Sequence, residues 1–350
     1  MSAKLSLRQI NAKATEFLMC HKTSQIESLL HLKRMQLTAT AFSPQYYYFK
    51  IRKPKGGYRE IEAPETELKK VQRKINEYLQ YVYSELKTDS AYGFIINPKR
   101  KQARNIVTNA RQHLGNNYML NLDFDDFFHQ ISKQDIIHIF SRKPFDFEKN
   151  TIRTLAKICT NNERLPMGAP TSPVLSNFHC IDLDNALLQW SRQNHIIYTR
   201  FVDDLTFSSK KEITTEQVEQ IENIIQKHQL KIERAKTKIY NKNDIKTVTG
   251  IIVGKEKLTI DRDYYTELDK DLERLQKSIE LNIITGHLND TYAIKKFKQE
   301  LMGKINFIAI VLGYENQIYN NYLNKFETAS NPPDKDILSM RWTKFSNYNF

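Results

Sequence analysis

An Asp pair is the first feature of the chain that could do chemistry. Asp203 and Asp204 follow an apolar and aromatic run, and alternation of apolar and polar residues resumes over 205–208. This pattern predicts a β-hairpin with both carboxylates at its tip. Mg²⁺ prefers oxygen ligands and commonly takes one or two carboxylates together with substrate phosphates, so the pair could bind it. A solvated turn is the alternative interpretation, because Asp is a common turn residue.

A third carboxylate ends a predicted strand. Residues 119–124 alternate, with Asp123 and Phe124 on opposite faces. If this strand lies beside the hairpin, three carboxylates meet at one sheet edge, and their repulsion is tolerable only if cations lie between them. Two Mg²⁺ ions roughly 3.5–4 Å apart can hold the attacking and leaving oxygens of an in-line phosphoryl displacement. Asp123, Asp203 and Asp204 therefore predict a two-metal site for phosphoryl transfer.

The composition of the chain favours a polyanionic partner. It has 350 residues, 40% of them hydrophobic, and a net charge of +13, with a pI near 9.4. This balance suits nucleic acid, although ribosomal and membrane-surface proteins share it. The three cysteines are scattered without a CxxC motif, which indicates reduced thiols. No apolar run reaches membrane-span length and the first residues lack a signal-peptide core, so we expect a cytoplasmic protein without membrane contact.

Periodicity predicts helices around a β-rich region near the N-terminus. Apolar residues recur at helical spacing over residues 1–40, 67–86, 132–162, 218–225 and much of the last 90 or so. Residues 46–64 instead form two β-rich runs joined by a Pro-Lys-Gly-Gly sequence, which predicts a hairpin with a basic tip. Lys53 and Arg59 could meet the triphosphate of a nucleotide, and Arg59 could bind phosphate bidentately. A solvated turn is again the alternative.

Three stretches resemble motifs of reverse transcriptases. Residues 118–128 are similar to the A motif, whose first Asp corresponds to Asp123, and residues 201–204 are similar to the C motif, which supplies Asp203 and Asp204. Residues 165–173 resemble the B motif, "PQGxPxSP". Two positions depart from the family pattern, because Phe201 replaces the Tyr of Tyr-x-Asp-Asp and Met167 replaces Gln. The resemblance implies that the three Asp side chains hold two Mg²⁺ ions.

The same resemblance implies roles for residues around the nucleotide. Phe128 is expected to lie under the sugar, where its ring would clash with a 2′-hydroxyl and select deoxynucleotides. A Lys of the D motif, which residues 230–239 resemble, would protonate the departing pyrophosphate, and Lys236 is the first candidate and Lys238 the second. Glu233 stands where that motif usually has Asn. The residues implied in nucleotide binding are Lys53, Arg59, Phe124, Phe128, Met167 and Gly168, and Phe124 also joins the implied metal site.

Two further strings resemble retron reverse transcriptases. Asn109-Ala110-x-x-His113 matches their NAxxH signature, and Val248-Thr249-Gly250 matches their VTG signature. The NAxxH string lies in residues 90–122, which contain no Asp or Glu and would follow an RNA backbone. The resemblance implies RNA binding by Asn109, Arg111, His113, Val248, Thr249 and Gly250. On its own, His113 would be interpreted as a structural histidine.

Retron reverse transcriptases prime DNA synthesis from a 2′-hydroxyl of their own non-coding RNA and make branched RNA–DNA. They act with a separate effector protein in bacterial antiphage defence. The resemblance therefore implies four kinds of partner: an msr–msd-type RNA, its RNA–DNA product (msDNA), dNTPs and an effector protein.

The fold class implied is α+β, a right-hand polymerase with fingers, a ferredoxin-like palm and a helical thumb. We expect an N-terminal helical extension over 1–45, fingers over 46–118, a palm over 119–245 with a finger insertion at about 132–170, and a primer grip and thumb over 246–350. One alternative is a group II intron-type maturase, which usually adds a further nucleic-acid-binding or endonuclease region that we do not expect here. A non-catalytic RNA-binding relative is the other, although it would have lost acids that this chain keeps.

Overall fold

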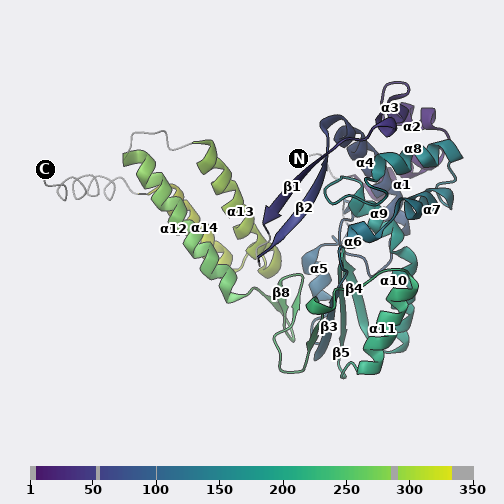
Figure 1. Ribbon diagram of the computed structural model, residues 1–350. Coiled ribbons are helices and arrows are strands. Elements are labelled where there is room, and N and C mark those ends of the chain that lie inside the picture. The colour runs from purple at the N-terminus through teal and green to yellow at the C-terminus, as the bar shows by residue number, and fades with distance from the viewer. Residues whose placement is uncertain (1–4, 53–55, 100, 285–290, 333–350) are drawn as a thin grey trace. The chain divides into compact units, whose positions relative to one another are not determined.

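The computed structural model describes residues 5–52, 56–99, 101–284 and 291–332. Its chain divides into two compact units, residues 1–244 and 245–350 (Figure 1). The first unit has eleven α-helices among its described residues: α1 (Leu7–Leu18), α2 (Thr23–Leu29), α3 (Gln36–Phe42), α4 (Thr66–Leu86), α5 (Ile106–Arg111), α6 (Phe127–Gln130), α7 (Lys133–Ser141), α8 (Lys149–Cys159), α9 (Ser172–His179), α10 (Ile181–Gln193) and α11 (Thr215–Lys227). Its strands are β1 (Tyr46–Arg52), β2 (Tyr58–Pro64), β3 (Tyr118–Asp123), β4 (Ile197–Phe201), β5 (Asp204–Ser209) and β6 (Lys238–Tyr240).

A four-stranded antiparallel sheet is the central element of this unit. Its strands stand in the order β4-β5-β3-β6. Helices including α9 and α10 connect β3 to β4, and α11 connects β5 to β6, so the connectivity is the βαββαβ pattern of a ferredoxin-like fold. Helix α10 packs on β4 and beside α11, and the two helices cover one face of the sheet (Figure 1). The predicted α+β class and ferredoxin-like palm are confirmed.

The alternating residues of β3 explain its place in the sheet. Met119, Leu120 and Leu122 are buried, whereas Asn121 and Asp123 are partly exposed. Strand β3 pairs with β5 along its whole length and with β6 over Met119–Asn121, and the carbonyl of Asp123 accepts a hydrogen bond from the backbone N–H of Glu233 at 2.8 Å, so the strand is held on both sides. The strand therefore brings Asp123 to the end of a rigid element rather than to a loop.

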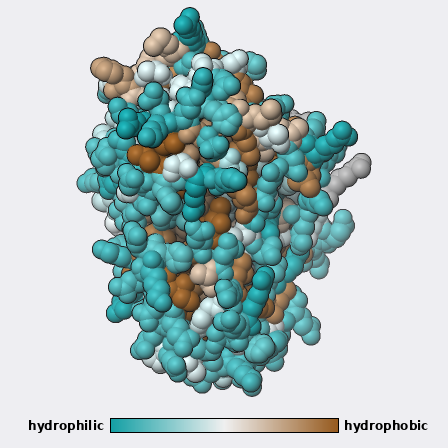
Figure 2. Space-filling view, turned by 90° about the vertical axis from the view of Figure 1, so that its right-hand side faces the viewer, coloured by the Kyte–Doolittle hydropathy of each residue, from teal (hydrophilic) through white to brown (hydrophobic). Residues whose placement is uncertain are grey.

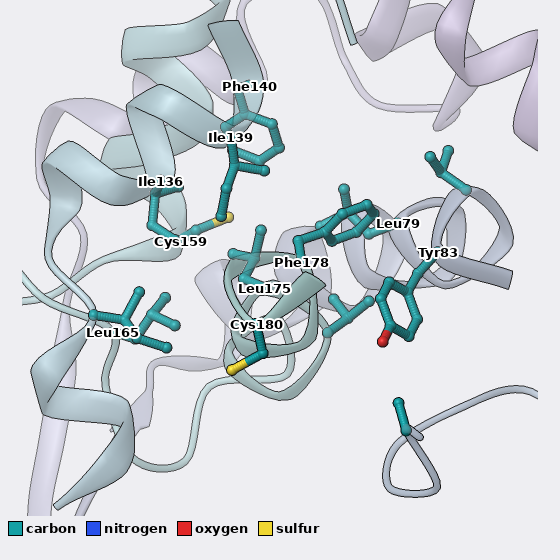
Figure 3. Packing of buried hydrophobic residues seen from close by; sticks show 14 of the residues in the cluster. Leu79, Tyr83, Ile136, Ile139, Phe140, Cys159, Leu165, Leu175, Phe178 and Cys180 are labelled. Carbon is teal, nitrogen blue, oxygen red and sulfur yellow. The ribbon is translucent and has the colours of Figure 1, made fainter. Parts of the chain in front are cut away.

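A helical layer holds the hydrophobic core that supports the sheet. Helix α9 lies in its middle, with Phe178 directed toward Leu79 and Tyr83 of α4, and the rings of Tyr83 and Phe178 meet edge to face at 5.2 Å (Figure 3). Residues from α7, among them Ile136 and Phe140, complete this part of the core. The position of α9 is therefore fixed by packing on several sides.

The N-terminal helices and the β1–β2 hairpin match the predicted elements. Helix α1 begins with a capping box in which Ser6 and Gln9 bond each other's backbone N–H groups, and it packs on α4. Strands β1 and β2 pair antiparallel over seven residues each, from Tyr46 opposite Pro64 to Arg52 opposite Tyr58. Lys53, at the predicted basic tip, lies outside the described residues.

The second unit contains a small sheet and three helices among its described residues. Its elements are β7 (Thr247–Val248), β8 (Ile251–Val253), β9 (Leu258–Thr259), α12 (Arg262–Ile284), α13 (Tyr292–Leu312) and α14 (Gln317–Ser330). Leu268, Leu272 and Leu275 are buried on one face of α12, as their spacing predicts. Gly303 in α13 has open space where a Cβ would stand.

Hydrophobic residues form small, separate patches on the face of the molecule shown in Figure 2, within a mainly hydrophilic surface. None of the helices in the described ranges is long and apolar enough to cross a membrane. All three cysteines, Cys20, Cys159 and Cys180, are buried and free, as their spacing predicts.

Candidate active site

The structure brings the three predicted carboxylates together at one end of the palm sheet. Asp123, the last residue of β3, stands opposite Asp204, the first residue of β5. The backbone N–H of Phe124 donates to the carbonyl of Asp203 at 3.1 Å, which joins the end of β3 to the hairpin tip. Residues 80 positions apart in the chain therefore become neighbours because β3 and β5 pair in this register.

The β4–β5 hairpin has a two-residue loop, Val202 and Asp203, between the paired residues Phe201 and Asp204. Val202 has a φ of 63°. A positive φ is unfavourable for a β-branched residue, and two-residue hairpin loops normally place Gly or Asn there. The surrounding structure must therefore hold this conformation, and such strain is typical of functional sites.

Crowding of the acidic groups changes their protonation. Burial is the main cause of the raised pKa of Asp203, and the charge of Asp123 adds to it. Burial, together with the charges of Asp203 and Asp123, raises the pKa of Asp204 to about 7. A buried, acidic site of this kind favours either a proton or a cation between its carboxylates.

Lys236 balances part of this charge. It ends a short 3₁₀ helix, Arg234–Lys236, and its Nζ lies 2.7 Å from Oδ1 of Asp123. Burial acts to lower the pKa of Lys236, but the hydrogen bond to Asp123 and the charges of Asp123, Asp203 and Glu233 outweigh it and raise that pKa. The ammonium group is therefore protonated at neutral pH and lies beside the carboxylates.

A cavity of about 600 Å³ opens onto this group. It is lined by Tyr58, Arg59, Glu60, Phe94, Phe124, Asp125, Asp126, Phe127, Phe128, His129, Arg164, Met167, Phe201, Val202, Asp203, Asp204, Glu233 and Lys236. The cavity thus joins the β1–β2 hairpin, the residues after β3 and the hairpin tip. Its size suits a small ligand, and its walls carry both cationic and anionic groups.

The nucleotide-binding residues predicted on the described chain all lie at or beside this cavity. Arg59 reaches it from β2, and its charge acts on Asp203. Phe128 is partly buried, and its ring centroid lies 5.6 Å from that of Phe127. Phe127 is 3% exposed and belongs to the hydrophobic core.

The loop before α9 rests on β2. The carbonyl of Met167 accepts a hydrogen bond from the backbone N–H of Glu62 at 2.8 Å. Gly168 has a φ of +131°, and a Cβ there would lie 2.9 Å from Cγ2 of Ile61 and 3.0 Å from the carbonyl of Glu62. Gly168 is predicted to bind the nucleotide, but the contact that demands a glycine in this structure is with β2.

Phe124 was predicted to bind both metal and nucleotide. Its side chain is 1% exposed and stacks on Phe127, with ring centroids 5.0 Å apart. A phenyl ring offers no donor atom to a cation, so only the main-chain carbonyl of Phe124 could serve as a ligand.

The predicted RNA contacts of the NAxxH string need correction. His113 is fully buried, with Nδ1 2.6 Å from Oγ of Ser208 and Nε2 2.8 Å from Oγ1 of Thr199. Burial lowers its pKa to about 3, so the ring is neutral, and its two hydrogen bonds join the segment after α5 to β4 and β5. Asn109 is 1% exposed as well. Only Arg111 of the three presents an exposed side chain.

The VTG string forms the loop of the β7–β8 hairpin. Thr249 and Gly250 have φ values of 48° and 82°, as in a type I′ turn, which explains the glycine. Val248 is fully buried, so its predicted RNA contact is wrong for the side chain. Gly250 is exposed at the turn with open space around it, whereas the hydroxyl oxygen of Thr249 is buried and has no hydrogen-bond partner in the described part of the chain.

Sequence reasoning missed a polar cluster beside the cavity. His129 lies 2.7 Å from both Oε1 of Glu62 and Oδ2 of Asp126, and Arg164 lies 3.4 Å from Oε1 of Glu62. The cluster links β2 to α6. No local pattern could have shown it, because Glu62 and Arg164 are distant from His129 in the sequence.

The donor chemistry at the hairpin tip fits a hard divalent cation. Three carboxylates gather there, and two of them have raised pKa values because of burial and mutual repulsion. Within the described ranges, however, no three Asp, Glu, His or Cys side chains are close enough to hold a metal by themselves. This agrees with Mg²⁺ chemistry, since Mg²⁺ is usually held by one or two carboxylates with substrate phosphates rather than by an all-protein cage.

A ferredoxin-like sheet that carries paired Asp residues at a hairpin tip beside a third Asp defines a palm-type nucleic-acid polymerase. The protein-family model for reverse transcriptase (RNA-dependent DNA polymerase) matches residues 51–256. Because this match covers more than half of the chain, the chain belongs to the reverse transcriptase family and is an RNA-directed DNA polymerase. The predicted enzyme class and right-hand fold are confirmed.

Within the family, the chain is similar to retron reverse transcriptases. It is 28% identical over 300 residues to the retron Ec86 reverse transcriptase of Escherichia coli, and the alignment covers 84% of this chain and 88% of that enzyme. It is also 28% identical over 271 residues to the retron Mx65 enzyme of Myxococcus xanthus, with 72% and 61% covered. Among solved structures, a telomerase from Candida albicans gives a TM-score of 0.46 at 10% identity, with 89% of this chain and 66% of that one covered. The predicted resemblance to retron enzymes is confirmed.

Proposed function

We propose that this reverse transcriptase copies a cognate structured non-coding RNA into DNA, starting from a 2′-hydroxyl of that RNA, at the cavity beside Asp203. The convergence of Asp123, Asp203 and Asp204 on the end of one sheet carries the proposal. Two Mg²⁺ ions held by these carboxylates and by the nucleotide phosphates would activate the attacking hydroxyl and stabilise the departing pyrophosphate. The protein supplies no nucleophile of its own.

Residues of the cavity wall bind the nucleotide and donate a proton to the leaving group. Arg59 binds the triphosphate from β2, and Phe128 lies where the sugar passes. Lys236 donates a proton to the departing pyrophosphate, for which its ammonium group is already charged. Its ion pair with Asp123 keeps it in place until the nucleotide arrives.

The RNA and the partners follow from the retron relatives. The net charge of +13 suits a long polyanion, and Arg111 and Gly250, which are exposed, could meet it. We propose an msr–msd-type RNA as template, branched RNA–DNA (msDNA) as product and dNTPs as substrates. A separate effector protein would link the product to antiphage defence in the bacterial cytoplasm. In this scheme residues 1–45 are an N-terminal helical extension, 46–118 are the fingers, 119–245 are the palm with a finger insertion at about 132–170, and 246–350 are the primer grip and thumb.

Expression of the protein together with its upstream locus tests this proposal. After RNase treatment of total nucleic acid, gel analysis should show a short single-stranded DNA that is absent with Asp203→Asn. Debranching before electrophoresis should shift the product if it is joined through a 2′ linkage. Linear DNA alone would refute priming from an internal 2′-hydroxyl, and DNA that persists with Asp203→Asn would refute the site.

Lys236→Gln is expected to lower kcat by about 100-fold, because a general acid typically contributes that much or more. The KM for dNTP should change little, since the residue acts on the departing group. A pre-steady-state measurement of single-nucleotide addition checks this. Lys238→Gln is the matched control, because Lys238 lies in β6 outside the cavity lining. Equal losses in both variants would contradict the assignment.

Mg²⁺ should stabilise the protein more at alkaline than at acidic pH. The pKa values of Asp203 and Asp204 are raised in the folded chain. Without metal, these two groups therefore contribute most stability at low pH and lose it as pH rises toward about 7. A cation restores that stability only where the protons have left.

Thermal unfolding with Mg²⁺ or EDTA at about pH 5.5 and about pH 8 checks this linkage. The gain in Tm from Mg²⁺ should be several-fold larger at the higher pH. An Asp203→Asn/Asp204→Asn double variant, which lacks both titrating groups, should show little gain at either pH. A pH-independent gain in the unaltered protein would count against a cation at these carboxylates.

A further inference from the structure

A buried ionic group lies directly behind the hairpin tip. Arg200, three residues before Asp203 on β4, has no exposed surface, and neither has Asp184 on α10. The Nε and Nη2 of Arg200 each donate a hydrogen bond to one carboxylate oxygen of Asp184, both at 2.8 Å. Asp184 also accepts from the hydroxyls of Thr88 at 3.0 Å and Tyr198 at 2.9 Å. Each carboxylate oxygen of Asp184 therefore accepts two hydrogen bonds, which hold the side chain rigidly.

The remaining nitrogen of Arg200 points to the catalytic hairpin. Its Nη1 donates to the carbonyl of Val202 at 3.0 Å and to Oδ1 of Asn177 at 3.1 Å. Val202 is the loop residue with the positive φ. Its carbonyl belongs to the peptide bond that leads into Asp203, so the bond to Arg200 fixes the orientation of that peptide.

Asn177 connects this contact to the loop that lines the cavity. It is 1% exposed on α9, which follows the loop carrying Met167, and its neighbours Leu175 and Phe178 are packed in the core (Figure 3). Its Nδ2 donates to the carbonyl of Gly93 at 3.0 Å. Arg200 therefore connects the carbonyl of Val202 to Asn177 on α9, a helix whose position is fixed by core packing.

Gly93 confines Val202 from the other side. A Cβ at Gly93 would lie 2.7 Å from Cγ2 of Val202 and 2.9 Å from its backbone nitrogen. Beside it, the backbone N–H of Tyr92 donates to the carbonyl of Arg200 at 2.9 Å, and the N–H of Arg200 donates to the carbonyl of Ser90 at 2.8 Å. Val202 is thus held between residues 90–93 and the Arg200 guanidinium.

We propose that Arg200 is a positioning residue for catalysis: with Asp184 and Asn177 it holds Val202 in its left-handed conformation, and so sets Asp203 and Asp204 against Asp123. This inference rests on the proposed role of those three carboxylates. A buried ion pair that only filled the core could be replaced by apolar side chains. An ion pair that only filled the core would not need the hydrogen bond from Arg200 to the carbonyl of Val202 in the strained loop.

Arg200→Lys tests the inference because it keeps the charge opposite Asp184 but loses the planar fork that reaches two partners at once. We expect kcat to fall by about 100-fold, as small misplacements of reacting groups do. The affinity of the nucleic-acid-free protein for Mn²⁺, measured by electron paramagnetic resonance, should fall about tenfold, since the ligands are misplaced. The KM for dNTP should change much less than kcat.

Val202→Gly separates positioning from stability. Glycine adopts a positive φ without strain, so the loop no longer needs Arg200 to hold it. Arg200→Lys should therefore cost less than about tenfold in kcat when combined with Val202→Gly. A purely structural Arg200 would give the same loss in both backgrounds, which would overturn the proposal.

Two further variants complete the test. Asn177→Ala keeps the ion pair intact, and it should reproduce part of the loss in kcat and in Mn²⁺ affinity even if Arg200→Lys does not fold. Glu27→Gln is the control: Glu27 is 5% exposed and accepts from the backbone N–H groups of Met35 and Leu37, at 3.0 and 2.9 Å. It should lower Tm without changing kcat or Mn²⁺ affinity.

These experiments distinguish a failure of the positioning role of Arg200 from a failure of the proposed catalytic site. Unchanged kcat and Mn²⁺ affinity in Arg200→Lys and Asn177→Ala, with an inactive Asp203→Asn, would overturn only the role of Arg200. Full activity of Asp203→Asn would instead overturn the catalytic site itself.

Discussion

Asp203→Asn is expected to lower kcat for DNA synthesis by at least about 1,000-fold, because the metal-held transition state loses several kcal/mol of stabilisation. The same variant should unfold at a higher temperature than the unaltered protein when metal is absent. Burial and the charge of Asp123 raise the pKa of Asp203, which means that its ionised form is unfavourable in the fold. A neutral amide of the same shape removes that cost.

Opposite changes in activity and stability are the informative result. A residue that merely supported the hairpin would lose both together, whereas a residue held in place for function loses activity and gains stability. Primer extension on a defined RNA template, with thermal unfolding in EDTA, measures the two quantities on the same preparation. Asp182→Asn is the control, because Asp182 forms an exposed ion pair with Arg142 at 2.9 Å and should change neither quantity noticeably.

A lower Tm for Asp203→Asn in EDTA would show that the carboxylate is stabilising, contrary to the electrostatics of the site. Retained activity would show that the catalytic acids lie elsewhere. The gain in Tm should be confined to the metal-free protein, since Mg²⁺ stabilises only the carboxylate form.

Local sequence patterns predicted the elements that carry the acids. Alternation before and after Asp203 gave the β4–β5 hairpin, and alternation before Asp123 gave β3, because pleated strands place successive side chains on opposite faces. The pairing of these strands was a hypothesis from charge and from family resemblance. The observed register, with Asp123 opposite Asp204, supplies what a linear pattern could not.

Burial and distant partners account for the predictions that failed. The NAxxH string gave no sign that the ring of His113 is enclosed between Ser208 and Thr199, about 90 positions further along the chain. Similarly, nothing near Gly168 in sequence indicated that β2 would press against it. A short motif marks a position in a fold, but the side chain's surroundings are assembled from remote segments, and these decide whether it faces a ligand or the core.

The departure at Phe201 has a structural consequence that the sequence also left open. Phe201 pairs with Asp204 in the hairpin and lines the cavity. A hydroxyl at this position is absent, so the ring contributes packing and shape rather than a hydrogen bond. The rings of Phe201 and Phe128 both line the cavity.

Phe128→Ala is expected to reduce discrimination against ribonucleotides by about 100-fold, because a steric wall rather than a hydrogen bond excludes the 2′-hydroxyl. Phe128 lines the cavity together with Asp203 and Asp204, and its ring is only partly buried against the core. Shortening it opens space on the cavity side. Incorporation of dNTP should fall by no more than about tenfold, since the carboxylates and Lys236 are untouched.

Phe127→Leu tests whether sugar discrimination depends on the Phe128 ring itself or on the packing of the neighbouring core. Phe127 is 3% exposed and stacked on Phe124, so its shortening should lower Tm and leave sugar discrimination nearly unchanged. The ratio of kcat/KM for dNTP and rNTP, measured for both variants on one template, gives the comparison. If Phe127→Leu relaxes sugar selection as much as Phe128→Ala does, selection depends on the general shape of the loop after β3. If only Phe128→Ala relaxes it, the ring itself is the barrier, because the two residues are adjacent in sequence and differ chiefly in burial.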